Sequence, residues 1–302
     1  MKALVIGYGS IGKRHAKILQ NMEKIDSVTV LSSQPNVPFE IINRIEEIIN
    51  INPDYIIIAS NTSLHYKQLQ FLEETFKDKT ILVEKPLFDC LHDYTIVNNK
   101  VFVAYNFRFH PMLSLIKEKT KGKKLWNINV FAGSYLPDWR PGRDYQTTYS
   151  AIKNAGGGVL LDLSHELDYV QFMAGEIEIG YTINEKVSNL EIETDDLLLL
   201  SGKTEKCSHI HISLNYFTRQ SFRKIIIDGE SISIQADLKA NTVSLYEDSK
   251  KREYSWPSLE RNSTYEAEHN AVVSGDYSKF CTYEEGIKTL QLIEKIKSFE
   301  IT

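Results

Sequence analysis

Cysteine is scarce in this chain of 302 residues: Cys90, Cys207 and Cys281 lie far apart, with no CxxC pair. An odd, scattered set makes neither a disulfide framework nor a thiolate zinc site, so we expect a reducing, cytoplasmic environment. No apolar run approaches the roughly 20 residues that span a bilayer. The short run Ala3–Ile6 ends at a glycine, unlike the hydrophobic region of a signal peptide.

An excess of positive charge is also missing. Lys and Arg total 35 against 40 Asp and Glu, a formal net charge of −5. Nucleic-acid and membrane-surface binders need a clustered positive field, so we expect neither partner. Hydrophobic residues make up 42% of the chain. A chain of this length usually exceeds one hydrophobic core, which predicts two domains.

Residues 1–120 alternate apolar β-branched runs with helical patterns. The runs at residues 3–6, 28–31, 55–59, 81–83 and 101–104 are typical of buried parallel strands. Isoleucines between residues 41 and 49 recur at helical spacing and predict a helix there. The pattern predicts an α/β fold with an N-terminal Rossmann domain, a doubly wound parallel sheet.

Residues 121–302 have a different texture, with many strand-like stretches in succession. Several alternate apolar and polar residues, as in residues 209–214, which is typical of a sheet with one packed face. Helical patterns return at residues 157–173 and 263–299. We expect a C-terminal α+β domain with a large, mostly antiparallel open sheet for substrate binding and oligomerisation. Its last helices could pack back on the first domain.

A glycine fingerprint follows the first strand. The segment from Gly7 to Gly12 reads G-x-G-x-x-G between a strand and a helix, the context in which such a turn binds a dinucleotide. The glycines permit a tight turn, and the helix N-terminus faces the pyrophosphate. The alternative is a glycine turn without a ligand. The expected cofactor contacts here are Gly7, Gly9, Ser10, Ile11 and Gly12.

The acid that would bind the adenosine ribose of NAD is missing after the second strand. Ser32 and Ser33 stand there instead, and they leave room for a 2′-phosphate. Arg14, on the first helix, could approach that phosphate. We therefore expect NAD(P) with a slight preference for NADP(H). The alternative is that the serines only begin a loop.

Two more segments follow strands at the carboxyl edge of the sheet, where ligands of open α/β sheets bind. Asn61, Thr62 and His65 follow the third strand and could contact the cofactor, or simply cap a helix. Glu84 and Lys85 follow the next strand. Lys85 there could donate to a substrate hydroxyl and to the nicotinamide ribose. The alternative is a solvated surface lysine.

Three glycines at residues 156–158 lead into an apolar helical pattern that carries Asp162, His165 and Asp168. Residues three apart share a helix face, so the carboxylates could orient the imidazole. Histidine exchanges protons near neutral pH, as carbonyl–alcohol interconversion requires. A buried structural histidine is the alternative. A metal site needs further ligands that are not evident, so we expect no metal.

Two polar, aromatic segments could bind substrate. Arginines suit carboxylate or phosphate groups, and aromatic rings suit sugar faces. A surface loop held by salt bridges and aromatic packing is the alternative for each. The candidate substrate contacts are Tyr105, Asn106, Arg108, Trp139, Arg140 and Arg143, with Asp162 and His165.

Together these segments resemble the Gfo/Idh/MocA oxidoreductases, the glucose–fructose oxidoreductase and inositol dehydrogenase family. The resemblance covers the glycine fingerprint, Glu84-Lys85-Pro86, the Tyr105-Asn106 segment and the triple-glycine helix. It implies a Rossmann domain and an open sheet that often joins subunits, hence a homodimer or homotetramer. It also implies a cis Lys85–Pro86 bond. The loop with Trp139 and Arg140 resembles a subgroup of surface-polysaccharide sugar pathways.

The resemblance implies roles for three residues. Lys85 would be the lysine of the EKP motif, His165 the catalytic acid/base and Asp162 its orienting partner. The family usually separates this Asp and His by four residues, whereas here they are three apart, which weakens the assignment of Asp162 most.

The expected function is an NAD(P)-dependent dehydrogenase or reductase that acts on a hydroxyl or keto carbon of a sugar derivative. That derivative could bear a nucleotide or a carboxylate. Two alternatives stay open: a cofactor-retaining lyase or glycosidase with transient oxidation, and a non-catalytic NAD(P)-binding sensor. A sensor would need neither Lys85 nor His165.

Overall fold

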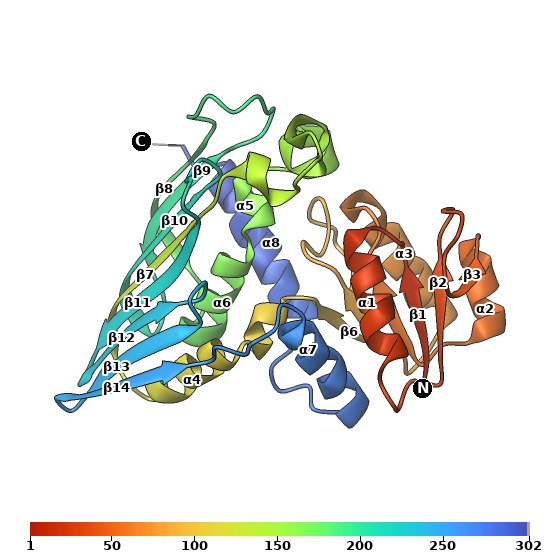
Figure 1. Cartoon of the computed structure of the whole chain (residues 1–302), viewed down its shortest axis with the longest axis horizontal. Helices are drawn as coiled ribbons and strands as arrows, with labels where there is room; N and C mark the ends of the chain where they lie inside the picture. The colour runs from red at the N-terminus through yellow and green to blue at the C-terminus, as the bar shows by residue number, and fades with distance from the viewer. Residues whose placement is uncertain (301–302) are drawn as a thin grey trace. The chain divides into compact units, whose positions relative to one another are not determined.

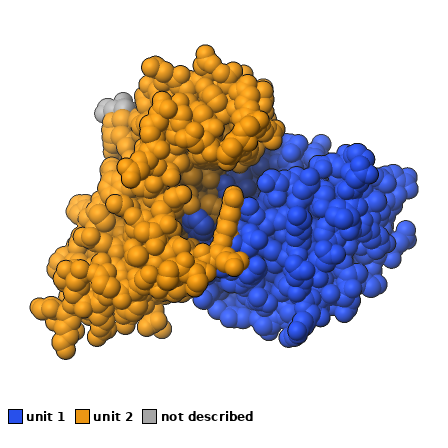
Figure 2. All heavy atoms as spheres, viewed as in Figure 1, with its two compact units in different colours: residues 1–109, 262–290 blue, residues 110–261, 291–302 orange. Residues whose placement is uncertain are grey.

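The computed structural model describes residues 1–300, which group into two compact units (Figure 2). Unit 1 comprises residues 1–109 and 262–290, and unit 2 comprises residues 110–261 and 291–300. A C-terminal segment thus belongs to the same compact unit as the N-terminus. Residues 110–120, which the sequence assigns to the first domain, group with unit 2. The border near residue 120 stays a prediction about separately folding domains.

Unit 1 is built on a seven-stranded sheet with the order β15-β6-β5-β4-β1-β2-β3 (Figure 1). Its neighbouring strands pair in parallel, except that β15 is antiparallel to β6. The strands are β1 (Lys2–Ile6), β2 (Ser27–Leu31), β3 (Glu40–Ile42), β4 (Tyr55–Ile58), β5 (Thr80–Val83), β6 (Lys100–Val103) and β15 (Cys281–Thr282). The Rossmann prediction is confirmed.

The central strands of this sheet are apolar because both faces are covered. In β4, Ile56 and Ile58 join one core cluster, while Tyr55 and Ile57 join the cluster on the opposite face. Side chains alternate across a strand, so a continuous apolar run is the pattern that serves two covered faces. The helices of unit 1 are α1 (Ser10–Gln20), α2 (Ile48–Ile51), α3 (Thr62–Thr75), α7 (Ser263–Ser274) and the first part of α8 (Tyr283–Lys297), with short turns η1 (Ile45–Glu47) and η2 (Asn106–Phe109).

One predicted helix of unit 1 is partly wrong. The isoleucine pattern at residues 41–49 begins with β3, which pairs in parallel with β2. Only η1 and α2 are helical there. An edge strand of three residues is too short to show a period of two, and the helical spacing of the later isoleucines masks it.

Unit 2 contains an eight-stranded sheet with the order β14-β13-β12-β11-β7-β10-β9-β8. All neighbours are antiparallel except β7 and β10. The large, mostly antiparallel sheet is therefore confirmed. Its strands are β7 (Leu125–Gly133), β8 (Glu178–Glu185), β9 (Leu197–Lys203), β10 (Cys207–Asn215), β11 (Phe222–Gly229), β12 (Ile232–Asp237), β13 (Thr242–Glu247) and β14 (Lys250–Ser255).

The helices of unit 2 correct a second expectation. The pattern after the triple glycine predicts one helix, but α5 ends at Asp162 and α6 begins at His165. The expectation that Asp162 and His165 share one helix face is therefore wrong, whereas His165 and Asp168 do lie three residues apart on α6. The helical segments are α4 (Pro111–Thr120), α5 (Val159–Asp162), α6 (His165–Ala174) and the turns η3 (Leu136–Trp139), η4 (Tyr145–Thr147), η5 (Tyr149–Ala151) and η6 (Lys153–Ala155).

Across residues 1–300, no helix combines the length and the apolar character of a membrane span.

Candidate functional site

The glycine turn of unit 1 leaves open space above the start of α1. Gly7 has φ +97°, and a Cβ at Gly12 would lie 2.1 Å from the carbonyl oxygen of Gly7. These two positions therefore need glycine for backbone reasons. Gly9 differs, because a Cβ there would meet nothing within 4 Å, and Gly9 directly precedes α1.

This geometry fits a dinucleotide. An open backbone at Gly9 lets a pyrophosphate approach closely, and the amides of the first helical turn, which includes Ser10 and Ile11, are the donors that an anion needs. No acidic side chain lies in that first turn. The residues present therefore suit the cofactor that the sequence predicts.

The residues proposed to select NADP(H) lie on two elements: Arg14 on α1, and Ser32 and Ser33 after β2. The Ser32 hydroxyl, after β2, accepts a hydrogen bond from the Gln34 amide at 3.0 Å, as in a loop turn. The Arg14 guanidinium lies 5.0 Å from the centre of the Tyr265 ring on α7. That ring also packs edge-on against His15. The role of Ser33 toward a 2′-phosphate stays a prediction, whereas the contact of Arg14 with Tyr265 favours a structural role for that arginine.

The segment after β4 braces the neighbouring turn. His65 is buried, with Nε2 3.2 Å from the Ser60 carbonyl oxygen and Nδ1 3.2 Å from that of Leu87. Burial is the main cause that lowers the pKa of His65. Asn61 precedes α3, and Thr62 is its first residue, with no side-chain cap from Asn61. The contacts of His65 favour a structural role.

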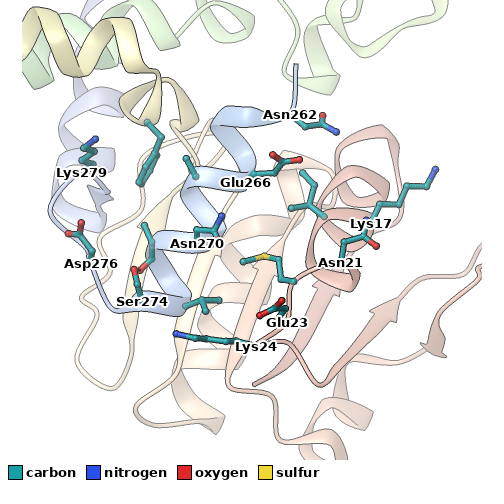
Figure 3. A pocket seen from close by; sticks show the side chains of 16 residues that line it. Lys17, Asn21, Glu23, Lys24, Asn262, Glu266, Asn270, Ser274, Asp276 and Lys279 are labelled. Carbon is teal, nitrogen blue, oxygen red and sulfur yellow. The ribbon is translucent and has the colours of Figure 1, made fainter. Parts of the chain in front are cut away.

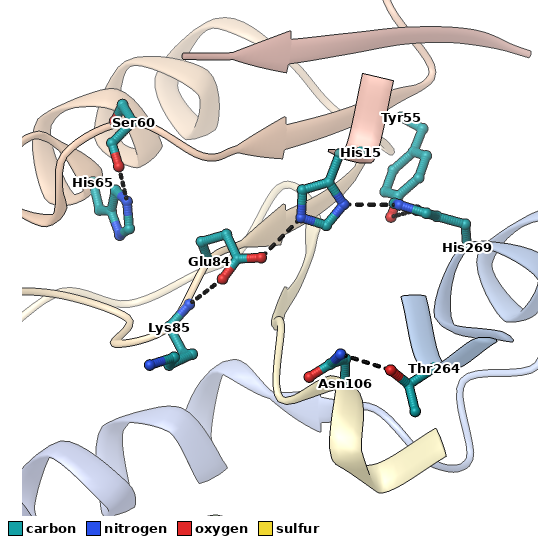
Figure 4. A network of polar contacts seen from close by, with 9 residues as sticks. All are labelled: His15, Tyr55, Ser60, His65, Glu84, Lys85, Asn106, Thr264 and His269. Carbon is teal, nitrogen blue, oxygen red and sulfur yellow. Dashed lines mark hydrogen bonds and ion pairs between the residues drawn. The ribbon is translucent and has the colours of Figure 1, made fainter. Parts of the chain in front are cut away.

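Glu84 lies at the end of a chain of buried side chains (Figure 4). Its Oε1 is 2.8 Å from His15 Nε2, and its Oε2 accepts a hydrogen bond from the Lys85 amide at 3.2 Å. His15 Nδ1 lies 2.8 Å from His269 Nε2, and His269 Nδ1 lies 2.9 Å from the Tyr55 hydroxyl. The Lys85–Pro86 bond is cis, which confirms the implication of the resemblance.

The segment after β6 is buried within unit 1. Asn106 donates to the Thr264 hydroxyl at 2.8 Å, and Arg108 donates to Glu285 at 2.7 Å. Arg108 also donates to the Phe280 carbonyl oxygen. Tyr105 is 2% exposed and belongs to a core cluster. These contacts favour structural roles, and substrate binding by the three residues stays a prediction.

In unit 2, Asp162 accepts a hydrogen bond from the Tyr216 hydroxyl at 2.6 Å. Burial first, and then the charge of Asp162, raise the pKa values of Tyr149 and Tyr216. Both phenols therefore stay protonated and can donate. His165 is half-buried as the first residue of α6, and Asp168 is buried in its first turn.

The aromatic loop of unit 2 packs near the same phenols. The Trp139 indole donates to the Ser134 hydroxyl and stands edge-on to the Tyr216 ring at 5.2 Å. The Arg140 guanidinium lies 4.9 Å from the centre of the Tyr149 ring. Arg143 is exposed. Trp139, Arg140 and Asp162 are thus linked through two tyrosines.

Several residues of these networks were not predicted as functional. They are His15, Tyr55 and His269 in unit 1, and Asp195 and Tyr216 in unit 2. Asp195 accepts from the Leu160 amide at the start of α5, and a Cβ on Gly158 would lie 2.2 Å from its carboxylate. The sequence shows no motif that would pair residues 35 or more apart, so only His15, inside the fingerprint helix, could have been noticed.

Two further features lie outside the predicted residues. A groove of about 1040 Å³ between α1 and α7 is lined by side chains of both charges, among them Lys17 and Glu266 (Figure 3). It contains none of the candidate residues. Elsewhere, ligand atoms of Asp89, Cys90 and His92 lie within 4.8 Å of one another, the one such group within residues 1–300. The sequence had not indicated it.

The N-terminal third of the chain matches the model of a known protein family. The model described as "Oxidoreductase family, NAD-binding Rossmann fold" (GFO_IDH_MocA) matches residues 1–98. Levoglucosan dehydrogenase of Pseudarthrobacter phenanthrenivorans is 28% identical over 137 residues, 41% of this chain. The match spans only 34% of that relative's length.

Solved structures match over nearly the whole chain. A structure of levoglucosan dehydrogenase with NADH has a TM-score of 0.81 at 15% identity, covering 98% of this chain and 96% of that one. UDP-N-acetylglucosamine 3-dehydrogenase GnnA from Acidithiobacillus ferrooxidans has a TM-score of 0.76 at 14% identity, with the same coverage. At such identities the likeness shows the fold alone.

Proposed function

Residues 1–98 belong to the Gfo/Idh/MocA family of NAD-binding oxidoreductases, and from this premise we propose an activity for the whole protein. It transfers a hydride between NAD(P) and a hydroxyl or keto carbon of a sugar or sugar derivative. The names of similar proteins, levoglucosan dehydrogenase and UDP-N-acetylglucosamine 3-dehydrogenase, support a sugar-type substrate.

One observation carries the proposal. The open turn at Gly9 and the Glu84–Lys85 pair follow β1 and β5, parallel strands of one sheet separated only by β4. The carboxyl ends of parallel strands share one edge, so a ligand on the glycine turn extends along the edge that carries Lys85. A dinucleotide cradle therefore adjoins a lysine that can act on an alcohol.

The residues take distinct roles in this proposal. The nicotinamide, when bound, supplies the hydride acceptor or donor. Lys85 donates to the substrate oxygen and stabilises its developing negative charge. His165 takes the hydroxyl proton as the alcohol becomes a carbonyl, and Asp162 orients the substrate or the imidazole. Trp139, Arg140 and Arg143 contact the sugar.

The first experiment is a dehydrogenase screen. Purified protein is mixed with sugars, polyols and nucleotide sugars and with each cofactor, and nicotinamide absorbance is followed. We expect net cofactor turnover with at least one sugar-type substrate. Binding of NAD(P)H without turnover by any compound of this class would favour the sensor alternative. Substrate conversion without net cofactor change would favour the lyase or glycosidase alternative.

The second experiment tests the site. Lys85→Ala and His165→Ala should abolish turnover while cofactor binding persists. Lys13→Ala, at an exposed position of α1, is a matched control that should keep it. Near-normal turnover in both site variants would contradict the proposed roles.

The proposed cofactor preference is slight, toward NADP(H), because no acid follows β2 in the sequence. Fluorescence titration of the wild-type protein with NADH and NADPH tests it. Much tighter binding of NADH would contradict the preference. The fold itself supports a nicotinamide dinucleotide of either kind.

We also propose that unit 2 forms a homodimer or homotetramer through the open face of its sheet. Tyr181, Ile183, Leu199 and Phe131 lie on that face, and Tyr181 is 42% exposed. A half-apolar sheet face of this kind suits an isologous partner. Light scattering should report an oligomer, and Tyr181→Arg should dissociate it.

A further inference from the structure

The buried side chains behind Glu84 come from three separate segments of unit 1. His15 lies on α1, Tyr55 on β4 and His269 on α7, and each is fully buried. They form a continuous line of hydrogen-bond contacts from the sheet interior to the Glu84–Lys85 turn (Figure 4). A line of four ionisable groups has a limited number of proton arrangements, and the contacts select among them.

Tyr55 fixes the first proton. Within residues 1–300, the Tyr55 hydroxyl has one hydrogen-bond partner, His269 Nδ1 at 2.9 Å. Burial is the main cause that raises the pKa of Tyr55, so the phenol keeps its proton. A buried hydroxyl with a single partner donates to it, because an unmade hydrogen bond is costly. His269 Nδ1 is therefore an acceptor.

The hydrogen bond from Tyr55 determines the tautomer of His269. Burial, and then the neighbouring His15, lower the pKa of His269, so its ring is neutral. A neutral imidazole carries one proton, and since Nδ1 accepts, the proton lies on Nε2. His269 Nε2–H then donates to His15 Nδ1 at 2.8 Å. His15 Nδ1 is in turn an acceptor.

His15 completes the line. With Nδ1 accepting, its proton lies on Nε2 and is donated to Glu84 Oε1 at 2.8 Å. The other oxygen, Oε2, accepts from the Lys85 amide. Both carboxyl oxygens of Glu84 are thus acceptors. An ionised carboxylate has two acceptor oxygens, whereas a protonated carboxyl group would direct an O–H toward another donor.

We infer that Tyr55, His269 and His15 are positioning residues: a tautomer-locked line that holds Glu84 as an oriented carboxylate one residue before Lys85. The inference rests on the proposed function only in that it makes this turn part of the catalytic site. It gives the C-terminal helix α7 a direct part in the cofactor-binding unit.

The acidic, tyrosine and histidine side chains around the line are uncharged, which leaves the Glu84 carboxylate as the one negative charge among them. Glu268 on α7 is fully buried, and neither carboxyl oxygen has a hydrogen-bond partner within the described residues. Burial, and then Glu84, raise its pKa, so Glu268 is neutral. Tyr265 on α7 stays protonated, and Arg14 contacts it from α1. His65 on α3 stays uncharged because burial lowers its pKa.

The first test needs neither cofactor nor substrate. Imidazole ¹⁵N chemical shifts of the wild-type protein, read by NMR near pH 7.5, distinguish the two neutral tautomers from imidazolium. We expect both His15 and His269 to be neutral with the proton on Nε2. A proton on Nδ1 of either ring, or an imidazolium at His15, would overturn the inference.

Two replacements of His269 separate positioning from packing. The amide of His269→Gln can stand in for Nε2 and still donate to His15, whereas that of His269→Asn stands in for Nδ1 and contacts only Tyr55. We expect His15 to keep the Nε2 proton in His269→Gln and to lose that single state in His269→Asn. Identical His15 spectra in the two variants would refute the line.

Tyr55→Phe and Glu268→Gln complete the series. Tyr55→Phe keeps the ring and removes only the hydroxyl, so it should fold. Without the donor to Nδ1, we expect His269 to populate both neutral tautomers. Glu268→Gln is the matched control on the same helix and should leave both tautomers unchanged. An unchanged His269 in Tyr55→Phe, or a change in Glu268→Gln as large as in His269→Asn, would overturn the inference.

Kinetics then connect the line to the site. In His269→Asn we expect kcat to fall about 10- to 100-fold with little change in KM, and His269→Gln to recover most of it. Equal kcat values in the two variants would refute a positioning role. If no sugar is turned over, the proposed function fails, while the spectra still decide the inference by themselves.

Discussion

Glu84 in unit 1 and Asp162 in unit 2 are both buried carboxyl groups at predicted chemical positions, yet the units hold them differently. Glu84 accepts from an imidazole and from the backbone amide of the next residue. Asp162 accepts from the Tyr216 phenol at 2.6 Å. Glu84 is thus anchored partly by its own turn, whereas Asp162 is held in part by a side chain 54 residues away.

The same contrast extends to the candidate ligand-binding residues of the two units. In unit 1 the candidate cofactor turn is made of backbone. Nearby atoms leave no room for a Cβ at Gly7 or Gly12, whereas the space beside Gly9 is empty to 4 Å. In unit 2 the candidate substrate residues are set by side-chain contacts such as Trp139 against Tyr216. Backbone-made sites leave a motif in the sequence, and sites made of side-chain pairs do not.

The largest effect should come from the backbone-made cradle. Gly12→Ala places a Cβ 2.1 Å from the Gly7 carbonyl oxygen, so backbone must move. We expect the free energy of unfolding to fall by about 3 kcal/mol or more, since overpacking costs about 1–3 kcal/mol even where side chains can adjust. Urea unfolding followed by circular dichroism measures this loss.

Gly9→Ala is its matched control. It meets no atom within 4 Å, so stability should stay within about 0.5 kcal/mol of the wild type. The added methyl occupies the proposed pyrophosphate space, so NADH binding should weaken. If Gly9→Ala loses as much stability as Gly12→Ala, then Gly9 is also needed for packing, and the proposed difference between the two glycines is wrong.

The second-largest effect should come from a substitution in unit 2, where side-chain contacts hold Asp162. Tyr216→Phe removes a hydrogen bond to a buried carboxylate, a loss of about 1.5–3 kcal/mol in unfolding free energy. We also expect kcat of any dehydrogenase activity to fall, because Asp162 loses a fixed partner. Chemical denaturation and steady-state kinetics check both effects. A variant with unchanged stability would show that Asp162 does not rely on Tyr216.

The sequence predicted the parts of the fold that depend on residues close together in the chain. The βαβ order and the glycine turn depend on neighbours within about 30 residues, and the Rossmann sheet is confirmed. The β3 strand was missed because three residues carry too little periodicity. The break between α5 and α6 was missed because neither glycine nor proline stands between Asp162 and His165, so no residue type there signals the end of a helix.

The candidate networks could not be predicted for another reason. His269 meets His15 across 254 residues, and Asp195 meets the Leu160 amide across 35. No periodicity encodes such pairs, because they arise only when α7 packs beside α1 and when α5 packs against β9, which Asp195 precedes. Gly9, in contrast, belongs to a glycine motif within six residues of chain, and Lys85 was singled out by its place shortly after a strand together with its flanking residues.

A pH-dependent effect sharpens the comparison of the units. Burial, with the Arg223 charge, lowers the pKa of His110 in unit 2 to about 4. The unfolded chain binds this proton below about pH 6.5 and the folded chain does not, so stability falls as the pH drops from 6.5 toward 4. We expect this group to remove about 2 kcal/mol between pH 7.5 and pH 5.

His110→Asn isolates that contribution. His110 Nδ1 accepts from the Met112 amide at the start of α4, and asparagine is a good replacement as a helix cap. Unfolding free energies at pH 7.5 and pH 5 should converge in the variant by the same amount. If the pH dependence is unchanged, it arises elsewhere, and the neutral buried histidines of unit 1 become its source.

The smallest effect concerns a charge beside the backbone-made cradle. Arg14→Gln removes a guanidinium 5.0 Å from the Tyr265 ring, a contact worth about 0.5–1 kcal/mol of stability. Tyr265 packs against His15, which reaches Glu84 after β5, whereas Ser32 follows β2 on the other side of β1. Fluorescence titration should therefore give NADPH-to-NADH affinity ratios that differ less than about twofold from the wild type. A tenfold loss for NADPH alone would instead show that Arg14 leaves Tyr265 for the 2′-phosphate, and that a side chain, not only backbone, defines the cofactor site of unit 1.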